Sequence, residues 1–231
     1  MFGNILYLNK KKVEQYSALI LGKNYEASHN NSSEDNTVNA LYMCSEFEKI
    51  LQKRDDYVDF VGDSQNTSIQ DVRISSIIRV SGEIYIPEQF DIIHLIGDYK
   101  SLLLSSVEYK DDDEKTMLKT MFDKSTMRIP IYCELGSACD YWMGIGKITP
   151  KDLLIEYNDL EDYEGTDVTI LARLESRKYY KDKPIPVYDI YKDFLGLNRA
   201  LRKEIKTSNK SFESIEVEED FLALELLAIY C

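Results

Sequence analysis

The chain has 231 residues, of which 44% are hydrophobic and 30% are charged, a composition typical of a globular protein with one large domain or two small ones. Its formal net charge of −13 repels phosphate backbones, so a nucleic-acid partner is not expected. The charge would suit a cationic partner, and solubility alone is the alternative reason for it. Its apolar runs are shorter than the ~18 residues of a membrane span, no signal peptide is evident and the four cysteines are scattered, so we expect a cytoplasmic protein without a membrane partner.

A strand and two helices are predicted in the first seventy residues. Residues 4–8 form a short apolar run, Asn9 is a typical helix N-cap, and Gly22 is placed to end the helix that follows. The polar residues 23–37 predict a mobile loop. A second helix is expected from about Val38, because apolar side chains recur there at helical spacing.

The pattern changes from helical to strand type after residue 70. Apolar residues alternate near the end of 71–86, as they do in a half-buried strand. Pro87 suits the first turn of a helix over 88–103, because its missing N–H would have no partner there. A short helix is expected over 115–122 after a charged segment.

Strands are predicted to dominate the remainder of the chain, at residues 129–135, 140–148, 153–157, 168–174 and 221–231. The clearest helical period covers 187–206. Short connections favour antiparallel neighbours. The predicted fold class is α+β, with a mostly antiparallel sheet, packed helices and a helical N-terminal portion. We divide the chain into an N-terminal part with the mobile loop, residues 1–70, and a main domain, residues 71–231; one continuous domain is the alternative.

Three framework segments resemble a protein family. These are "ILYLNKKKVEQYSALILG" at 5–22, "VSGEIYIPEQFDIIHLI" at 80–96 and "LALELLAIYC" at 222–231. They resemble an uncharacterised bacterial and phage family with a Tyr-Leu-Asn/Asp strand-then-helix opening and a terminal Ala-Ile-Tyr strand. The resemblance implies no established activity. It implies a role in a phage–host or bacterial defence setting.

Histidine and carboxylate patterns predict no catalytic or metal site. The two histidines, His29 and His94, are too few for His-based triads or His-rich metal sites. The acidic run 111–114 implies no fixed geometry. The acidic segment from residue 159 departs from EF-hand spacing, because Gly165 stands seventh where the sixth position needs glycine. We expect no catalytic residue, no metal ligand and no cofactor.

The segment 129–150 has some features of a phosphate loop but does not match that motif. A phosphate loop needs serine or threonine after its Gly-Lys pair, and here Ile148 follows Lys147; its first glycine position holds Tyr141. Cys133 and Cys139 are too far apart for a Cys-x2-Cys site, so we expect them to be buried structural cysteines.

Two groups of residues remain candidates for ligand or partner binding. Trp142, Gly144 and Gly146 share one face of strand 140–148, where the glycines would leave room for the ring, for a backbone or for a ligand. The second group is basic and aromatic, with a solvated helix face as its alternative interpretation; it comprises Arg177, Tyr179, Tyr180, Arg199, Arg202 and Lys203.

The leading hypothesis is a non-catalytic cytoplasmic protein that binds another protein, in a phage–bacterium conflict or defence setting. Seventeen tyrosines support it, because tyrosine is enriched at recognition surfaces. One alternative is an enzyme or sensor that binds a small nucleotide between the glycine-bearing strand and Arg177 or Arg199. A second alternative is an acidic mimic of nucleic acid.

Overall fold

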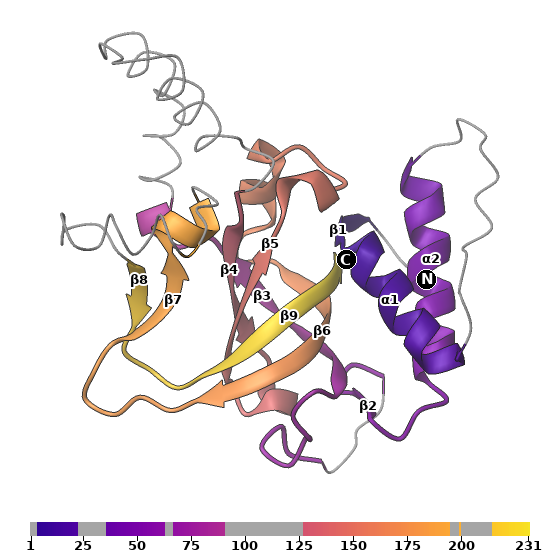
Figure 1. Cartoon of the computed structure of the whole chain (residues 1–231), viewed down its shortest axis with the longest axis horizontal. Helices are drawn as coiled ribbons and strands as arrows, with labels where there is room; N and C mark the ends of the chain where they lie inside the picture. Colours follow the sequence, from indigo (N-terminus) through magenta and orange to yellow (C-terminus); the bar gives the residue numbers. More distant parts are fainter. Residues whose placement is uncertain (1–3, 23–35, 63–66, 91–126, 195–198, 200–213) are drawn as a thin grey trace, which may run out of the picture.

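The computed structural model in Figure 1 describes residues 4–22, 36–62, 67–90, 127–194, 199 and 214–231. A barrel of five strands lies at its centre, and the strands close in the order β3-β4-β5-β9-β6-β3. Their bounds are β3 (Ile77–Tyr85), β4 (Ile129–Leu135), β5 (Met143–Ile148), β6 (Asp167–Lys178) and β9 (Phe221–Tyr230). Four of the five pairings are antiparallel, and β5 pairs with β9 in parallel.

Short strands and two helices surround the barrel. Strand β1 (Ile5–Leu8) is antiparallel to the end of β9, and β2 (Tyr57–Asp59) is parallel to the start of β3. Helices α1 (Lys10–Leu21) and α2 (Asn36–Leu51) lie together on one side, whereas β7 (Ile185–Asp189) and β8 (Ser214–Val217) form a separate antiparallel pair on the other (Figure 1). The mixed α+β composition is confirmed. The N-terminal portion is not purely helical, because β1 and β2 extend the main sheet.

Helix α1 begins and ends where its capping residues predict. The Asn9 side chain accepts a hydrogen bond from the Lys12 amide at 3.1 Å, which satisfies one of the unpaired N–H groups of the first turn. At the other end Gly22 takes the left-handed conformation, with φ 63°, and its amide donates to the Ala18 carbonyl. Both caps depend on local sequence, so they could be predicted.

Glycines in β5 allow its close packing against the leucines of β9. A Cβ atom on Gly144 would lie 2.7 Å from Leu224 Cδ1, and one on Gly146 would lie 2.5 Å from Leu226 Cγ. The two leucines belong to the buried cluster that fills the barrel. The space beside the glycines is therefore taken up by leucine side chains of β9 and, next to Gly146, by the Leu224 carbonyl oxygen, rather than by the Trp142 ring.

A second buried cluster lies between the helices and the outer wall of the barrel. It joins residues of β1, α1 and α2 to residues of β3, β6 and β9, among them Ile5, Val13, Met43, Phe47, Leu51, Ile77, Leu171 and Leu227. Helices α1 and α2 thus bury their apolar faces on strands of the barrel rather than on each other alone. The N-terminal elements share a core with the main sheet.

Two predicted elements differ from the structure. Residues 187–189, expected to begin a helix over 187–206, are the end of strand β7, which is followed by one π-helical turn at Ile190–Phe194. β7 pairs with β8, and this pairing overrides the helical period. The expected strand 153–157 lies between two 3-10 turns, and only Leu153 forms a bridge, to Tyr7.

Several predictions lie wholly or partly outside the described residues. For the helix expected over 88–103, residues 88–90 are described and are helical. The remainder of that helix, residues 195–198 and 200–206 of the helix expected over 187–206, the helix at 115–122, the acidic run 111–114, most of the loop at 23–37, and both histidines fall outside the described ranges.

Candidate functional site

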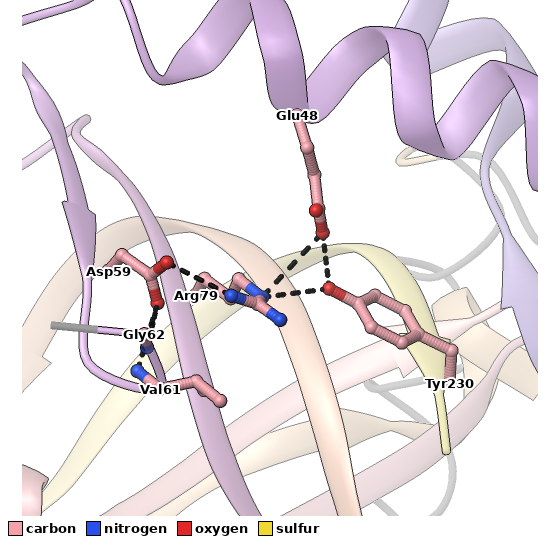
Figure 2. A network of polar contacts seen from close by, with 6 residues as sticks. All are labelled: Glu48, Asp59, Val61, Gly62, Arg79 and Tyr230. Atoms are coloured by element: carbon pink, nitrogen blue, oxygen red, sulfur yellow. Dashed lines mark hydrogen bonds and ion pairs between the residues drawn. The ribbon is translucent and has the colours of Figure 1, made fainter. Parts of the chain in front are cut away.

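A partly buried polar network joins α2 and β2 to the barrel (Figure 2). Arg79 on β3 donates to the Tyr230 hydroxyl at 3.0 Å and to Asp59 Oδ2 at 3.0 Å, and Tyr230 donates to the carboxylate of Glu48. Asp59 also accepts hydrogen bonds from the amides of Val61 and Gly62, each at 2.9 Å.

Burial shifts the titration of the acidic groups in this network. Desolvation raises the pKa of the Glu48 carboxyl above its ordinary value, against the lowering effects of Tyr230 and Arg79. Desolvation, followed by the hydrogen bond to Glu48 and the charge of that carboxylate, raises the pKa of the Tyr230 phenol, which keeps it a neutral donor. None of these residues lines either of the two hollows described below. We interpret the network as the attachment of the helices to the barrel.

A hollow of about 450 Å³ opens at the end of the barrel where β4 leads into β5. We call it the Trp142 hollow, and its lining residues are Glu134, Leu135, Asp140, Tyr141, Trp142, Met143, Glu219 and Asp220. Four of these side chains are carboxylates and none is basic. Within the described part of the chain, no group of three or more His, Cys, Asp or Glu residues is arranged to hold a metal ion. The four carboxylates therefore line the hollow without forming a cluster that could coordinate one ion.

An unusual backbone conformation precedes Trp142. Asp140 and Tyr141 both have a φ of 54°, in the left-handed region that a tyrosine rarely adopts. Hydrogen bonds on both sides hold the turn: the Trp142 amide donates to the Cys139 carbonyl, and the Trp142 carbonyl accepts from the Leu135 amide, both at 3.1 Å. The Tyr141 ring is left 78% exposed at the edge of the hollow. Strain of this kind clusters at functional sites.

The register of three strands brings Trp142 and Tyr179 together. Met143 of β5 and Lys178 of β6 both pair with Phe221, from opposite sides of β9. The residues one step beyond, Trp142 and Tyr179, therefore lie on either side of the segment that leads into β9. Their rings meet edge to face, with centroids 5.9 Å apart and an interplanar angle of 84°.

The residues that the sequence predicted as a binding site lie in different parts of the structure. Tyr180 belongs with Trp142 and Tyr179, because its amide donates to Asp220 Oδ1 at 2.7 Å. Arg177 does not: its guanidinium donates to the Ile69 carbonyl at 2.7 Å and to the Val72 carbonyl, so it holds the 69–72 loop. Arg199 is exposed, and Arg202 and Lys203 lie outside the described residues.

Four acidic residues of the hollow were missed by sequence reasoning. Glu219 and Asp220 end the acidic run 218–220 just before β9, and Glu134 stands near the end of β4. Their position next to strand ends could have drawn attention to these acidic residues. Only the pairing of β5 with β9 shows that they lie near Trp142.

The cysteines of this region are structural. Cys133 and Cys139 are buried free thiols, and burial raises the pKa of each to about 12, so neither forms a thiolate near neutral pH. This confirms that they are buried structural cysteines.

Comparisons of the chain with protein-family models, with curated proteins and with solved structures gave no significant match. No helix in the described ranges has the length and apolar character needed to cross a membrane.

Proposed function

We propose that the protein is a non-catalytic binding protein and that its Trp142 hollow docks a basic segment of a protein partner. The observation that carries the proposal is that aromatic side chains lie beside carboxylates in a hollow that no basic residue lines. Trp142 and the projecting Tyr141 stand beside four carboxylates, and no lysine or arginine lines the hollow. An aromatic face and a carboxylate both attract an arginine or lysine side chain.

Apolar residues within the hollow suit the same ligand. Leu135 and Met143 line it together with the carboxylates. A lysine or arginine can lay its methylene chain on such surface while its charged end reaches an acidic group. Tryptophan and tyrosine are also the residues that most often dominate binding energy at interfaces. The hollow therefore combines the features expected of a docking site for a basic side chain.

The overall charge supports the same class of partner. A net charge of −13 accelerates the approach of a basic segment and slows that of an acidic one, and the effect weakens with added salt.

The proposal is tested by titration calorimetry with short peptides of equal length that are arginine-rich, lysine-rich, neutral or acidic. We expect heat of binding with the two basic peptides alone, and affinity that decreases as salt increases. Equal binding of the neutral peptide, or no binding of either basic peptide, would contradict it.

Two broader expectations stay predictions from the sequence. They are the cytoplasmic location and the phage–bacterium or defence setting. The nucleic-acid mimic is a different proposal, because a mimic needs an extended surface of carboxylates. Substitution of Trp142 hollow residues would barely affect a mimic, whereas it should weaken peptide docking.

A further inference from the structure

A second hollow opens in the barrel wall between β5 and β9. The parallel pairing of these strands ends at Ile145 and Ala223, and β1 begins to pair with β9 only at Ala228. A cleft of about 470 Å³ occupies the interval, and Gly146, Leu224 and Leu226 are among the residues that line it. Its volume is within the range of about 300–1,000 Å³ that small-molecule sites occupy. We call it the β5–β9 cleft.

The charge of the β5–β9 cleft is opposite to that of the whole chain. The chain has 41 acidic and 28 basic residues, yet the cleft is lined by five basic side chains and two acidic ones. The basic residues are Lys12, Arg128, Lys147, Lys178 and Lys192, and the acidic ones are Glu175 and Glu225. In the described structure, Lys178 and Lys192 form no ion pair. Both charges are therefore free to act on a ligand.

A buried carboxylate binds one of the cations and lies near a second. Asp193 is 1% exposed, and its Oδ2 atom lies 2.5 Å from the Lys147 ammonium and accepts from the Asp189 amide at 3.1 Å. Its Oδ1 atom lies 3.9 Å from the Arg128 guanidinium and has no hydrogen-bond partner among the described residues. Arg128 thus keeps its hydrogen-bond donors for another acceptor. The two cations and one carboxylate leave a net positive charge at this wall.

Neutral groups stand next to these cations. Tyr7 is buried in the cleft wall, and its hydroxyl accepts a hydrogen bond from the Asn9 side chain at 3.2 Å. Burial, ahead of the opposing effect of Asn9, raises the pKa of Tyr7 to about 12, so the hydroxyl keeps its proton near neutral pH. Thr149 also lines the cleft. A protonated phenol beside lysine and arginine is a suitable donor for a phosphate oxygen.

Another part of the lining is apolar. Ile145, Val187, Phe221 and Ala223 line the cleft and belong to one apolar cluster. A ligand with a charged group at one end and an apolar or ring-shaped body at the other would contact both the basic and the apolar residues of the lining.

We propose that the β5–β9 cleft binds a small phosphomonoester, with its phosphate against Lys147, Arg128 and Tyr7 and its body against Ile145 and Phe221. The site is distinct from the Trp142 hollow and does not depend on peptide docking. Of the residues in the nucleotide site expected from the sequence, only Gly146 lines the cleft. Arg177 does not line it and instead donates to a carbonyl of the 69–72 loop.

The test uses the whole chain and measures thermal unfolding and calorimetric binding with four probes at equal ionic strength. The probes are inorganic phosphate, adenosine monophosphate, a hexose phosphate and citrate. We expect the two phosphomonoesters to raise the midpoint of unfolding in a concentration-dependent way and inorganic phosphate to bind more weakly. Binding of citrate alone, or no stabilisation by either phosphomonoester, would overturn the proposal.

Substitutions that leave the fold intact test whether the phosphomonoester binds in the β5–β9 cleft. Lys178→Gln with Lys192→Gln removes two cations that hold no ion pair, so the unliganded protein should unfold at the wild-type temperature. We expect affinity for the bound phosphomonoester to decrease about threefold to tenfold, and to decrease also in Tyr7→Phe. The matched control, Lys53→Gln, removes an exposed lysine that does not line the cleft and should leave affinity unchanged. An equal loss in the control, or wild-type affinity in the double variant, would place the binding elsewhere.

Discussion

The guanidinium of Arg79 donates a hydrogen bond to the Tyr230 hydroxyl over 3.0 Å, inside the layer between the barrel and its helices. Arg79 lies on β3 and Tyr230 ends β9, and through the phenol both connect to Glu48 of α2 (Figure 2). One hydroxyl therefore joins three elements that are far apart in sequence. Loss of this group should affect the stability of the whole chain.

Tyr230→Phe should destabilise the protein by about 1–3 kcal/mol, because it removes the hydrogen bond that the buried Glu48 carboxylate accepts from the phenol and one of the hydrogen bonds that Arg79 donates, while Arg79 keeps its bond to Asp59. Urea unfolding followed by circular dichroism measures the change. Tyr42→Phe is the matched control, since Tyr42 is exposed, and it should change stability by less than about 0.5 kcal/mol. Equal stability of the two variants would contradict the role given to the network.

Glu48 should make stability fall with rising pH. Its pKa is raised in the folded state above the ordinary value of 4.5, chiefly by burial, so the folded protein binds this proton more tightly than the unfolded chain does. Its contribution is most favourable below pH 4.5 and is lost as pH rises through the folded-state pKa.

The comparison of wild type with Glu48→Gln isolates this contribution from other carboxyls. We expect the stability of wild type relative to the variant to decrease as pH rises above about 4.5. If this relative stability is constant or increases with pH, the Glu48 carboxylate is well solvated, or Tyr230 and Arg79 fully offset the effect of burial.

Gly146→Ala should destabilise the barrel by about 1–3 kcal/mol through overpacking. The added Cβ would lie 2.5 Å from Leu226 Cγ and 3.1 Å from the Leu224 carbonyl oxygen, and the latter is backbone that cannot easily move. Gly136→Ala is the control, because its Cβ would approach only the Ser81 carbonyl, at 3.7 Å. Chemical denaturation of the two variants gives the comparison, and similar stabilities would argue against the close packing of β5 on β9.

Tyr141→Asn should separate stability from binding. Asparagine tolerates the left-handed backbone that Tyr141 adopts, so the variant should be as stable as wild type or more stable by up to about 1 kcal/mol. The loss of the exposed ring should weaken the binding of a basic peptide. Thermal unfolding and peptide titration measure the two effects, and a variant that keeps wild-type affinity would exclude Tyr141 from the docking site.

Local signals made part of the fold predictable. The strand at 129–135 was located from its apolar composition and its boundaries, and α1 from its Asn9 and Gly22 caps. The closure of the barrel was not predictable, because it depends on β6 pairing with both β3 and β9 across a long stretch of chain. The helical period at 187–206 was misleading at residues 187–189, since it gave no information about the strand that pairs with β7.

The candidate site was predictable only as separate residues. Trp142 and Tyr179 were each singled out, but their contact follows from a register in which both neighbours pair with Phe221. Arg177 was assigned to the same group as Tyr179 because the two are close in sequence. Its guanidinium instead bonds to backbone carbonyls of the 69–72 loop, a partner that sequence spacing does not reveal.

The fluorescence of Trp142, the single tryptophan of the chain, tests the docking proposal most directly. A basic peptide titrated into the wild-type protein should shift the emission and saturate. Asp220→Asn should weaken the apparent affinity about twofold to fivefold, whereas Glu161→Gln, an exposed carboxylate outside the hollow, should leave it unchanged. An unaltered Trp142 emission while the peptide binds would place the partner elsewhere and contradict the account.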